Sequence, residues 1–211
     1  MNPTTLRLTI AGPAGEIECA LNAPSATPRG VAVICHPHPQ HGGTMDNTVV
    51  QKLARALLQL DYRTVRFNFR GVGASQGAWD EGRGEIDDAL AVIAVSRGED
   101  PASPLPLVLA GFSFGGYVAA EAARRLDDAH RAERLVLVGP STARQQVPEV
   151  PADTVVIHGE TDDVVPLSAT LDWARPQNLP VIVMPGVGHF FHGQLPLLKS
   201  LIVQQMLVAP G

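Results

Sequence analysis

The sequence predicts one α/β domain that spans residues 1–211, built on a twisted, mostly parallel sheet of eight strands with helices on both faces. Three observations predict this fold class. Short apolar runs recur along the chain, segments with helical spacing of apolar residues separate most of them, and nearly all of the runs are apolar throughout rather than alternating. Strands that alternate with helices pair in parallel, and strands that are apolar on both sides are covered on both faces. With 45% hydrophobic residues, the chain can bury a core without disulfides or metals.

The first two strands differ from the others because they alternate between apolar and polar residues. Residues 5–10 (TLRLTI) and 16–21 (EIECAL) flank the turn AGPAG and predict an antiparallel hairpin with one solvated face. Six strand-like runs follow: VAVICH (31–36), RTVRFNF (63–69), PLVLAG (106–111), RLVLVG (134–139), DTVVIHG (153–159) and LPVIVMPG (179–186).

Four further segments have the apolar spacing of a helix. In the first of them, Val49, Leu53 and Leu57 recur at every fourth position and therefore share one face. The predicted helices are NTVVQKLARALLQL (47–60), EIDDALAVIAVS (85–96), GGYVAAEAARRL (115–126) and LPLLKSLIVQQMLV (195–208). The proline-rich segment at residues 140–153 is too short to hold a folded insertion between its two strands.

Charge and cysteine content exclude several classes of protein. The formal net charge is -5 and the chain has no block of lysine or arginine, so we expect neither nucleic acid nor a membrane surface as partner. No apolar stretch is long enough to span a bilayer, and the first residues lack the pattern of a secretory signal, so we expect a cytoplasmic protein. Cys19 and Cys35 lie in apolar runs and are expected to be reduced core residues, with a catalytic role for Cys35 as the alternative.

The pattern G-x-S-x-G occurs twice, around Ser75 and around Ser113. A serine hydroxyl becomes a nucleophile when a base takes its proton and N–H donors receive the developing oxyanion. Ser113 stands where a buried strand runs directly into a helix, which exposes the hydroxyl above the sheet and places the next N–H at a helix N-terminus. Several polar and glycine residues separate Ser75 from the next helix. The context therefore favours Ser113 as the nucleophile and a loop position for Ser75.

Carboxylates and histidines follow the last two predicted strands. The segment ETDDVVP (160–166) follows one strand, and VGHFFHG (187–193) follows the other. Because the carboxyl ends of parallel strands meet at one edge of a sheet, we expect these side chains to lie near Ser113. The chain order Ser, Asp, His is the one expected for a nucleophile on a strand-turn-helix.

The segments GFSFGG (111–116), HGETDDVVP (158–166) and GHFFHG (188–193) resemble the nucleophile, acid and histidine motifs of the α/β-hydrolase superfamily. The resemblance covers nearly the whole chain. With CHPHPQHGGTMDN (35–47) and FNFRGVGASQG (67–77), the sequence resembles more narrowly the small bacterial serine hydrolases, or esterases, that have this fold without a lid domain.

The resemblance implies a catalytic triad in which each residue has a defined role. Ser113 would be the nucleophile, His189 the general base, and Asp162 the acid that orients the histidine ring. Asp163 and His192 are the neighbouring alternatives for the acid and the base.

The resemblance also implies an oxyanion hole made of two backbone N–H groups, those of Phe114 and His38. Pro37 and Pro39 have no N–H to offer. Gln40 is the alternative second donor.

Three histidines, His36, His38 and His41, form the pattern H-x-H-x-x-H, which could bind zinc. Prolines follow two of them and no nearby acid completes the set, so we expect neither a metal nor a cofactor. His36 is instead expected to form hydrogen bonds at the end of its strand, and His130 and His158 are expected to be structural.

Aromatic residues gather near the predicted catalytic edge and are candidates for substrate binding, with core packing as the alternative for each. They are Phe112, Phe190, Phe191 and Trp79.

These observations together predict a serine hydrolase whose partner is a small-molecule ester. A carboxylesterase that forms an acyl-enzyme is favoured, and the short joint at residues 140–153 favours small or short-chain acyl groups. A thioesterase, acyltransferase or perhydrolase with the same triad is the first alternative. A metal-dependent hydrolase and a noncatalytic binding protein are the others.

Overall fold

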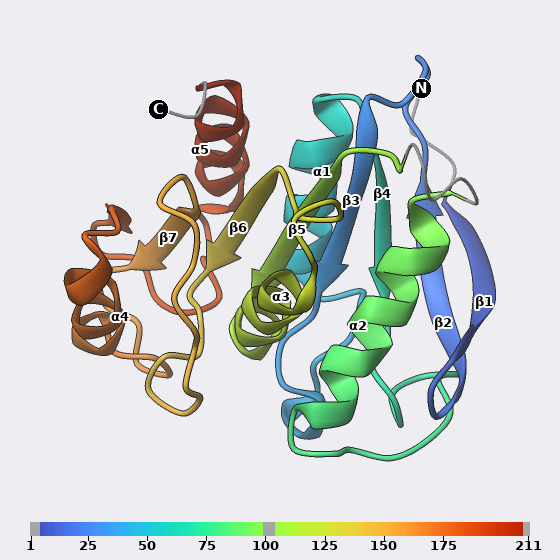
Figure 1. Cartoon of the computed structure of the whole chain (residues 1–211). Coiled ribbons are helices and arrows are strands. Elements are labelled where there is room, and N and C mark those ends of the chain that lie inside the picture. Colours follow the sequence, from blue (N-terminus) through green and yellow to red (C-terminus); the bar gives the residue numbers. More distant parts are fainter. Residues whose placement is uncertain (1–4, 99–103, 209–211) are drawn as a thin grey trace.

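The computed structural model describes residues 5–98 and 104–208. All eight strands within these ranges form one twisted sheet in the order β1-β2-β4-β3-β5-β6-β7-β8 (Figure 1). β1 and β2 form an antiparallel hairpin, β2 pairs antiparallel with β4, and the remaining neighbours pair in parallel. The strands are β1 Leu6–Gly12, β2 Gly15–Asn22, β3 Gly30–Cys35, β4 Tyr62–Phe67, β5 Leu107–Phe112, β6 Arg134–Val138, β7 Val155–Gly159 and β8 Val181–Met184. The predicted fold class is confirmed.

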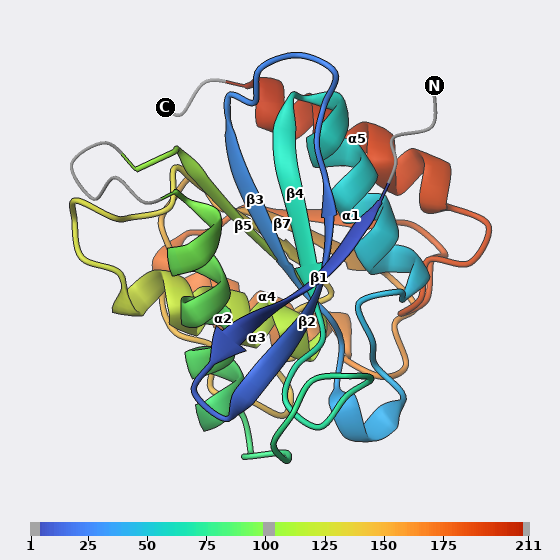
Figure 2. The same ribbon diagram turned by 90° about the vertical axis from the view of Figure 1, so that its right-hand side faces the viewer.

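Helices cover both faces of the sheet (Figure 2). α1 and α5 pack together on one face, and α2 and α3 pack together on the other. The helices are α1 Thr48–Gln59, α2 Arg83–Ser96, α3 Phe114–Arg125, α4 Leu167–Ala174 and α5 Leu195–Leu207, with short 3-10 helices at Pro39–His41 and Arg175–Gln177. The four helices expected from apolar spacing are therefore present.

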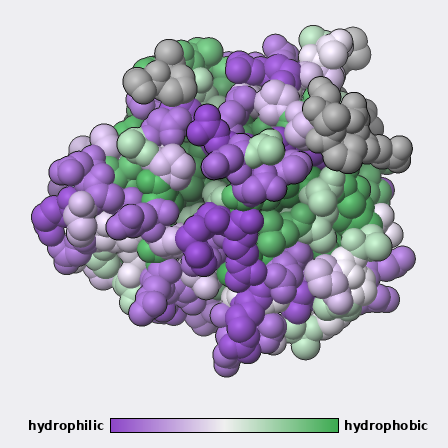
Figure 3. All heavy atoms as spheres, in the orientation of Figure 1, coloured by the Kyte–Doolittle hydropathy of each residue, from purple (hydrophilic) through white to green (hydrophobic). Residues whose placement is uncertain are grey.

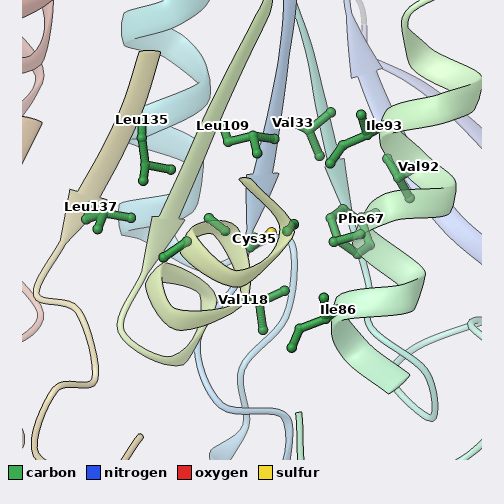
Figure 4. Packing of buried hydrophobic residues seen from close by; sticks show 14 of the residues in the cluster. Val33, Cys35, Phe67, Ile86, Val92, Ile93, Leu109, Val118, Leu135 and Leu137 are labelled. Atoms are coloured by element: carbon green, nitrogen blue, oxygen red, sulfur yellow. The ribbon is translucent and has the colours of Figure 1, made fainter. Parts of the chain in front are cut away.

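Two apolar cores lie on opposite sides of the sheet. In the core seen in Figure 4, Val33 and Leu109 of the central strands meet Val92 of α2 and Val118 of α3. Cys19 and Cys35 are buried free thiols in this core, and burial raises the pKa of the Cys19 thiol to about 12. A thiol this resistant to ionisation is a packing residue.

Two elements differ from what the apolar pattern predicts. β8 is an edge strand and only one of its residues is buried, so the expectation that every late strand is covered on both faces is wrong there. α4 escapes the sequence analysis because its eight residues bury only Thr170 and Ala174, too few to form an apolar stripe.

Polar and apolar side chains mix on the face shown in Figure 3, with hydrophilic residues covering most of it. Within residues 5–98 and 104–208, no helix combines the length and apolar character that crossing a membrane requires.

The strand order determines where the functional groups meet. β5 lies at the centre of the sheet between β3 and β6, and β7 follows directly. The loops that leave the carboxyl ends of these strands therefore converge at one edge.

Candidate active site

Ser113 occupies a sharp turn between β5 and α3. Its backbone has φ 57 and ψ -120, a conformation that few non-glycine residues adopt. Glycines make room for this turn: a Cβ on Gly111 would lie 2.1 Å from the carbonyl oxygen of Gly115, and one on Gly115 would lie 2.2 Å from that of Cys35. The turn places the serine hydroxyl above the end of the sheet, at the first turn of a helix.

His189 and Asp162 lie beside Ser113 although they are far from it in the chain. The Nε2 atom of His189 is 3.0 Å from the Oγ atom of Ser113, and its Nδ1 atom is 2.6 Å from Oδ2 of Asp162. A carboxylate can only accept, so Nδ1 carries the proton and Nε2 is free to accept from the serine hydroxyl. The structure thus brings together the three predicted triad residues in the order that proton transfer requires.

The carboxylate of Asp162 is buried but well supplied with donors. Its second oxygen, Oδ1, accepts backbone N–H groups from Val164 at 3.0 Å and Val165 at 2.7 Å. Burial by itself would raise the pKa of this carboxyl, but the bonds from His189 and Val165 outweigh it and the pKa is lowered. Asp162 is therefore an anion where His189 needs one.

The neighbouring alternatives lie elsewhere. Asp163 is exposed to solvent. His192 is also exposed, with its ring 5.8 Å from that of Phe190. It is His189 that contacts both the serine and the carboxylate.

Two backbone N–H groups near Ser113 are available to an oxyanion. Phe114 is the first residue of α3, so its N–H has no partner within the helix. Within the described part of the chain, the N–H of His38 donates no hydrogen bond, whereas that of Gln40 donates to Nδ1 of His38 at 3.3 Å. Because Gly115 packs directly against the end of β3, the loop that holds His38 lies against the turn at Ser113.

His36 fixes the loop that carries His38. Its Nε2 accepts the N–H of Phe69 at 3.1 Å, and its Nδ1 donates to the carbonyl oxygen of Pro37 at 2.6 Å. Complete burial lowers the pKa of His36 to about 4 and keeps the ring neutral. The bond to Pro37 orients the peptide whose other end is the N–H of His38.

The three histidines of the H-x-H-x-x-H pattern do not converge. Both ring nitrogens of His36 are used in hydrogen bonds, while the rings of His38 and His41 stack at 4.4 Å. Across residues 5–98 and 104–208, no three histidine, cysteine or acidic side chains are placed to bind one metal ion.

The four candidate substrate-binding aromatics have different environments. Phe112 and Phe191 are completely buried, which is the core-packing alternative; Phe112 lies 4.9 Å from the ring of His189 and supports it. Phe190 is 43% exposed beside His189, and Trp79 is half-buried against the rings of His38 and Phe114. Only Phe190 and Trp79 of the four offer surface to a ligand.

Ser75 lies in a loop, as expected, and is buried there. Its hydroxyl accepts the N–H of Glu18 at 2.9 Å and donates to the carbonyl oxygen of Asn68 at 2.7 Å. The same loop is held to α2 by Arg70, which forms an ion pair with the buried Asp88 at 2.8 Å. Both sides of the Ser75 hydroxyl are occupied by backbone groups.

One further side chain lies at this site although the sequence motifs do not indicate it. His158, expected to have a structural role, lies with Nε2 at 3.5 Å from Oδ2 of Asp162. Its position near the end of β7, four residues before Asp162, was the available signal.

A central parallel sheet with a serine on the turn after its middle strand, and an acid and a histidine after two later strands, defines the class of α/β-hydrolases. The family model described as "Serine aminopeptidase, S33" matches residues 26–152. The chain belongs to this family of α/β serine hydrolases.

Solved structures of similar proteins extend the match over the full chain. An α/β serine hydrolase without a lid from Xanthomonas campestris is 36% identical, with a TM-score of 0.88 over 100% of this chain and 99% of that one. An α/β serine hydrolase homologue from Coxiella burnetii is 37% identical, with a TM-score of 0.84 over 96% of this chain and 97% of that one.

Curated relatives match over shorter spans. A protein of Rickettsia prowazekii is 39% identical over 114 residues, which cover 54% of this chain and 48% of that protein. A protein of Mycobacterium tuberculosis is 29% identical over 175 residues, which cover 71% of this chain and 60% of that protein. The chain thus spans about half to three fifths of the length of these relatives.

Proposed function

We propose that the protein hydrolyses carboxylic esters with small or short acyl groups, using Ser113 as nucleophile, His189 as base and Asp162 as orienting acid. The observation that carries this proposal is the continuous path of hydrogen bonds from Ser113 through His189 to Asp162, with separations of 3.0 and 2.6 Å. Both distances lie within the range that general-base catalysis needs.

The reaction follows from this path. His189 takes the hydroxyl proton through Nε2 while Oγ of Ser113 attacks the ester carbonyl, and the imidazolium is stabilised by Asp162. The N–H groups of Phe114 and His38 receive the oxyanion. His189 then gives its proton to the departing alcohol, which leaves an acyl-enzyme. A water molecule, deprotonated by His189, attacks that acyl group, and the carboxylic acid departs as the proton returns to Ser113.

The preference for short acyl groups rests on the joint between β6 and β7. Residues 139–154 contain no helix, so no lid covers the serine from this side. Phe190 beside His189 is exposed, which leaves a shallow apolar surface for a small acyl group. A long hydrocarbon chain would stay largely in water and gain little from binding.

A series of nitrophenyl esters from acetate to palmitate tests the proposal. We expect the highest kcat/KM for the shortest chains, complete inactivation by a fluorophosphonate, and loss of turnover in Ser113→Ala. Ser200→Ala, on the exposed side of α5, is the matched control and should keep wild-type rates. Faster turnover of palmitate than of butyrate would refute the open site.

The same experiment separates the competing activities. Aminoacyl nitroanilides test the aminopeptidase activity named in the family description, acyl thioesters test thioester hydrolysis, and an added alcohol tests acyl transfer. Hydrolysis of anilides in preference to esters, or loss of activity on adding a chelator, would contradict the proposal.

A further inference from the structure

We propose that His158 is a positioning residue for the triad, and that the path from Ser113 to Asp162 continues through His158 to Thr170 and Thr142. This inference rests on the proposed function, because it assigns His158 a role in the efficiency of that site. It gives a task to a buried imidazole that the reaction itself does not use.

The first link joins His158 to the loop of the triad acid. His158 is the penultimate residue of β7 and is completely buried, with Nε2 at 2.9 Å from the carbonyl oxygen of Val165. A carbonyl only accepts, so Nε2 carries the proton. The same N–H edge faces Oδ2 of Asp162 at 3.5 Å, the oxygen that also receives the bond from His189.

The second link fixes the state of the ring from the other side. Nδ1 of His158 lies 3.2 Å from Oγ1 of Thr170, and since Nδ1 has no proton in this tautomer, the threonine hydroxyl donates. Thr170 is buried on α4, and its oxygen accepts from the hydroxyl of Thr142 at 2.9 Å. The direction of each hydrogen bond in this series is therefore fixed, from Thr142 to Thr170 and from Thr170 to His158.

These bonds enclose the short loop that holds the carboxylate. Val165 donates its N–H to Oδ1 of Asp162 at 2.7 Å and accepts from His158 through its carbonyl oxygen. A rotation of the Asp162 side chain would break the first bond, and a movement of the loop would break the second. His158 thus keeps Oδ2 aimed at His189.

The charge of His158 matters as much as its position. Burial lowers its pKa below the usual range, and the ionisable groups that face it are Asp162 and His189. A neutral ring turns the positive end of an N–H dipole toward the carboxylate without a full charge that would oppose the imidazolium of His189. Removal of that dipole makes Asp162 a stronger acceptor for His189.

Two variants of His158 test this role, with ester hydrolysis followed as a function of pH. His158→Phe removes both bonds, and we expect kcat to fall by about 10-fold to 100-fold with KM nearly unchanged. The acidic limb of the profile should move to higher pH, because a stronger carboxylate acceptor favours the protonated form of the base. His158→Gln, which can retain the donor to Val165, should restore most of kcat.

The threonines provide a milder pair in case His158→Phe does not fold. Thr170→Val removes the donor to His158 and should change kcat and the acidic limb in the same directions by smaller amounts, while Thr170→Ser should behave as wild type. Thr154→Val is the matched control, since Thr154 is buried and its hydroxyl has no hydrogen-bond partner among the described residues.

A spectroscopic readout separates this inference from the proposed function. The low-field proton resonance of the bond between His189 and Asp162 can be observed without any substrate. We expect it to move further downfield in Thr170→Val and to stay in place in Thr154→Val. An unchanged resonance and acidic limb in Thr170→Val, with only thermal stability reduced, would overturn the positioning role. Absence of ester turnover in the wild type would instead refute the proposed function.

Discussion

The chain contains two pentapeptides of the form G-x-S-x-G, and they have opposite fates in the structure. At Ser113 the hydroxyl lies 3.0 Å from a histidine ring that is itself held by a carboxylate. At Ser75 the hydroxyl is saturated by backbone groups of Glu18 and Asn68. The same residue in the same short pattern contacts a histidine ring in one place and fixes a loop in the other.

The glycines of the two pentapeptides also serve different purposes. Gly111 and Gly115 are needed for space, because a Cβ on either would collide with a backbone carbonyl. Gly73 and Gly77 are needed for conformation as well, with φ of 56 and 87. The comparison teaches that the pattern acquires its meaning from the strand before it and the helix after it.

The largest expected effect is that of Ser113→Ala on turnover. We expect kcat for a short ester to fall by about four orders of magnitude or more, because the nucleophile is lost. The free energy of unfolding should change little, since among residues 5–98 and 104–208 the Ser113 hydroxyl forms a hydrogen bond with His189 alone. Ester assays measure the change in kcat, and urea unfolding measures the change in stability. Equal activity in Ser113→Ala and wild type would contradict the assignment of Ser113, rather than Ser75, as the nucleophile.

Gly115→Ala tests the claim of space. The new methyl group would lie 2.2 Å from the carbonyl oxygen of Cys35, a backbone atom that cannot move aside. We expect a loss of roughly 3 kcal/mol or more in the free energy of unfolding. Gly77→Ala is the matched change in the other pentapeptide and should cost about 1 to 2 kcal/mol. Urea unfolding of both variants provides the measurement, and the reverse order would contradict the assignment.

Acid should lower the free energy of unfolding through His36, which contacts the loop that contains Ser75. His36 receives the N–H of Phe69 at the start of that loop, and its pKa in the folded protein is about 4 instead of 6.5. As the pH falls from 6.5 to 4, His36 becomes protonated in the unfolded chain but stays largely neutral in the folded protein. The free energy of unfolding therefore falls by roughly 3 kcal/mol.

His158 adds to this loss with the same sign, because its pKa is also lowered by burial. His36→Gln keeps one hydrogen-bond donor and one acceptor but does not titrate. It should therefore reduce the dependence of the free energy of unfolding on pH. Urea unfolding of both proteins across this pH range is the measurement, and identical slopes would rule out His36 as the titrating group.

Ser75→Ala should have a smaller effect, and mainly on stability. Removal of the hydroxyl leaves the N–H of Glu18 and the carbonyl of Asn68 without their partner, which we expect to cost about 2 kcal/mol. Catalysis should continue, because Ser75 does not contact His189. A thermal melt and an ester assay on the same sample distinguish this from Ser113→Ala, which should give the opposite pair of results.

The smallest effect is expected for His192→Ala. His192 is exposed and its ring lies beside Phe190, so kcat/KM should stay within about twofold of wild type. His189→Ala is the matched change in the same loop and should reduce kcat by about a thousandfold or more. A large loss of kcat/KM in His192→Ala would indicate that His192, and not His189, is the general base.

The sequence reveals those parts of the fold and site that depend on local pattern. Strands and long helices can be predicted because their apolar residues recur with a fixed period. Ser113 can be predicted as a site residue because a strand precedes it and a helix follows it. α4 is not visible because it buries too few side chains. Phe190 and Phe191 are adjacent in the sequence, yet one is 43% exposed and the other fully buried.

Long-range contacts explain what remains hidden. Phe191 has φ 54, a backbone conformation that its side chain gives no reason to expect. Because of this turn, the rings of Phe190 and Phe191 point in different directions. The protonation states of His36 and His158 depend on Phe69 and Thr170, which belong to other elements. Motifs therefore indicate which residues meet, whereas the direction of each hydrogen bond requires the structure.

The joint between β6 and β7, which carries no helix, has a consequence for the fate of the proposed acyl-enzyme. Residues 139–154 contain no helix that could cover the ester bound at Ser113, so we expect water to enter the site during the proposed reaction and to compete with any other acceptor. We expect cleavage to dominate over transfer, and velocity to rise smoothly through the solubility limit of the ester, without the jump at an oil–water boundary that a hinged cover produces.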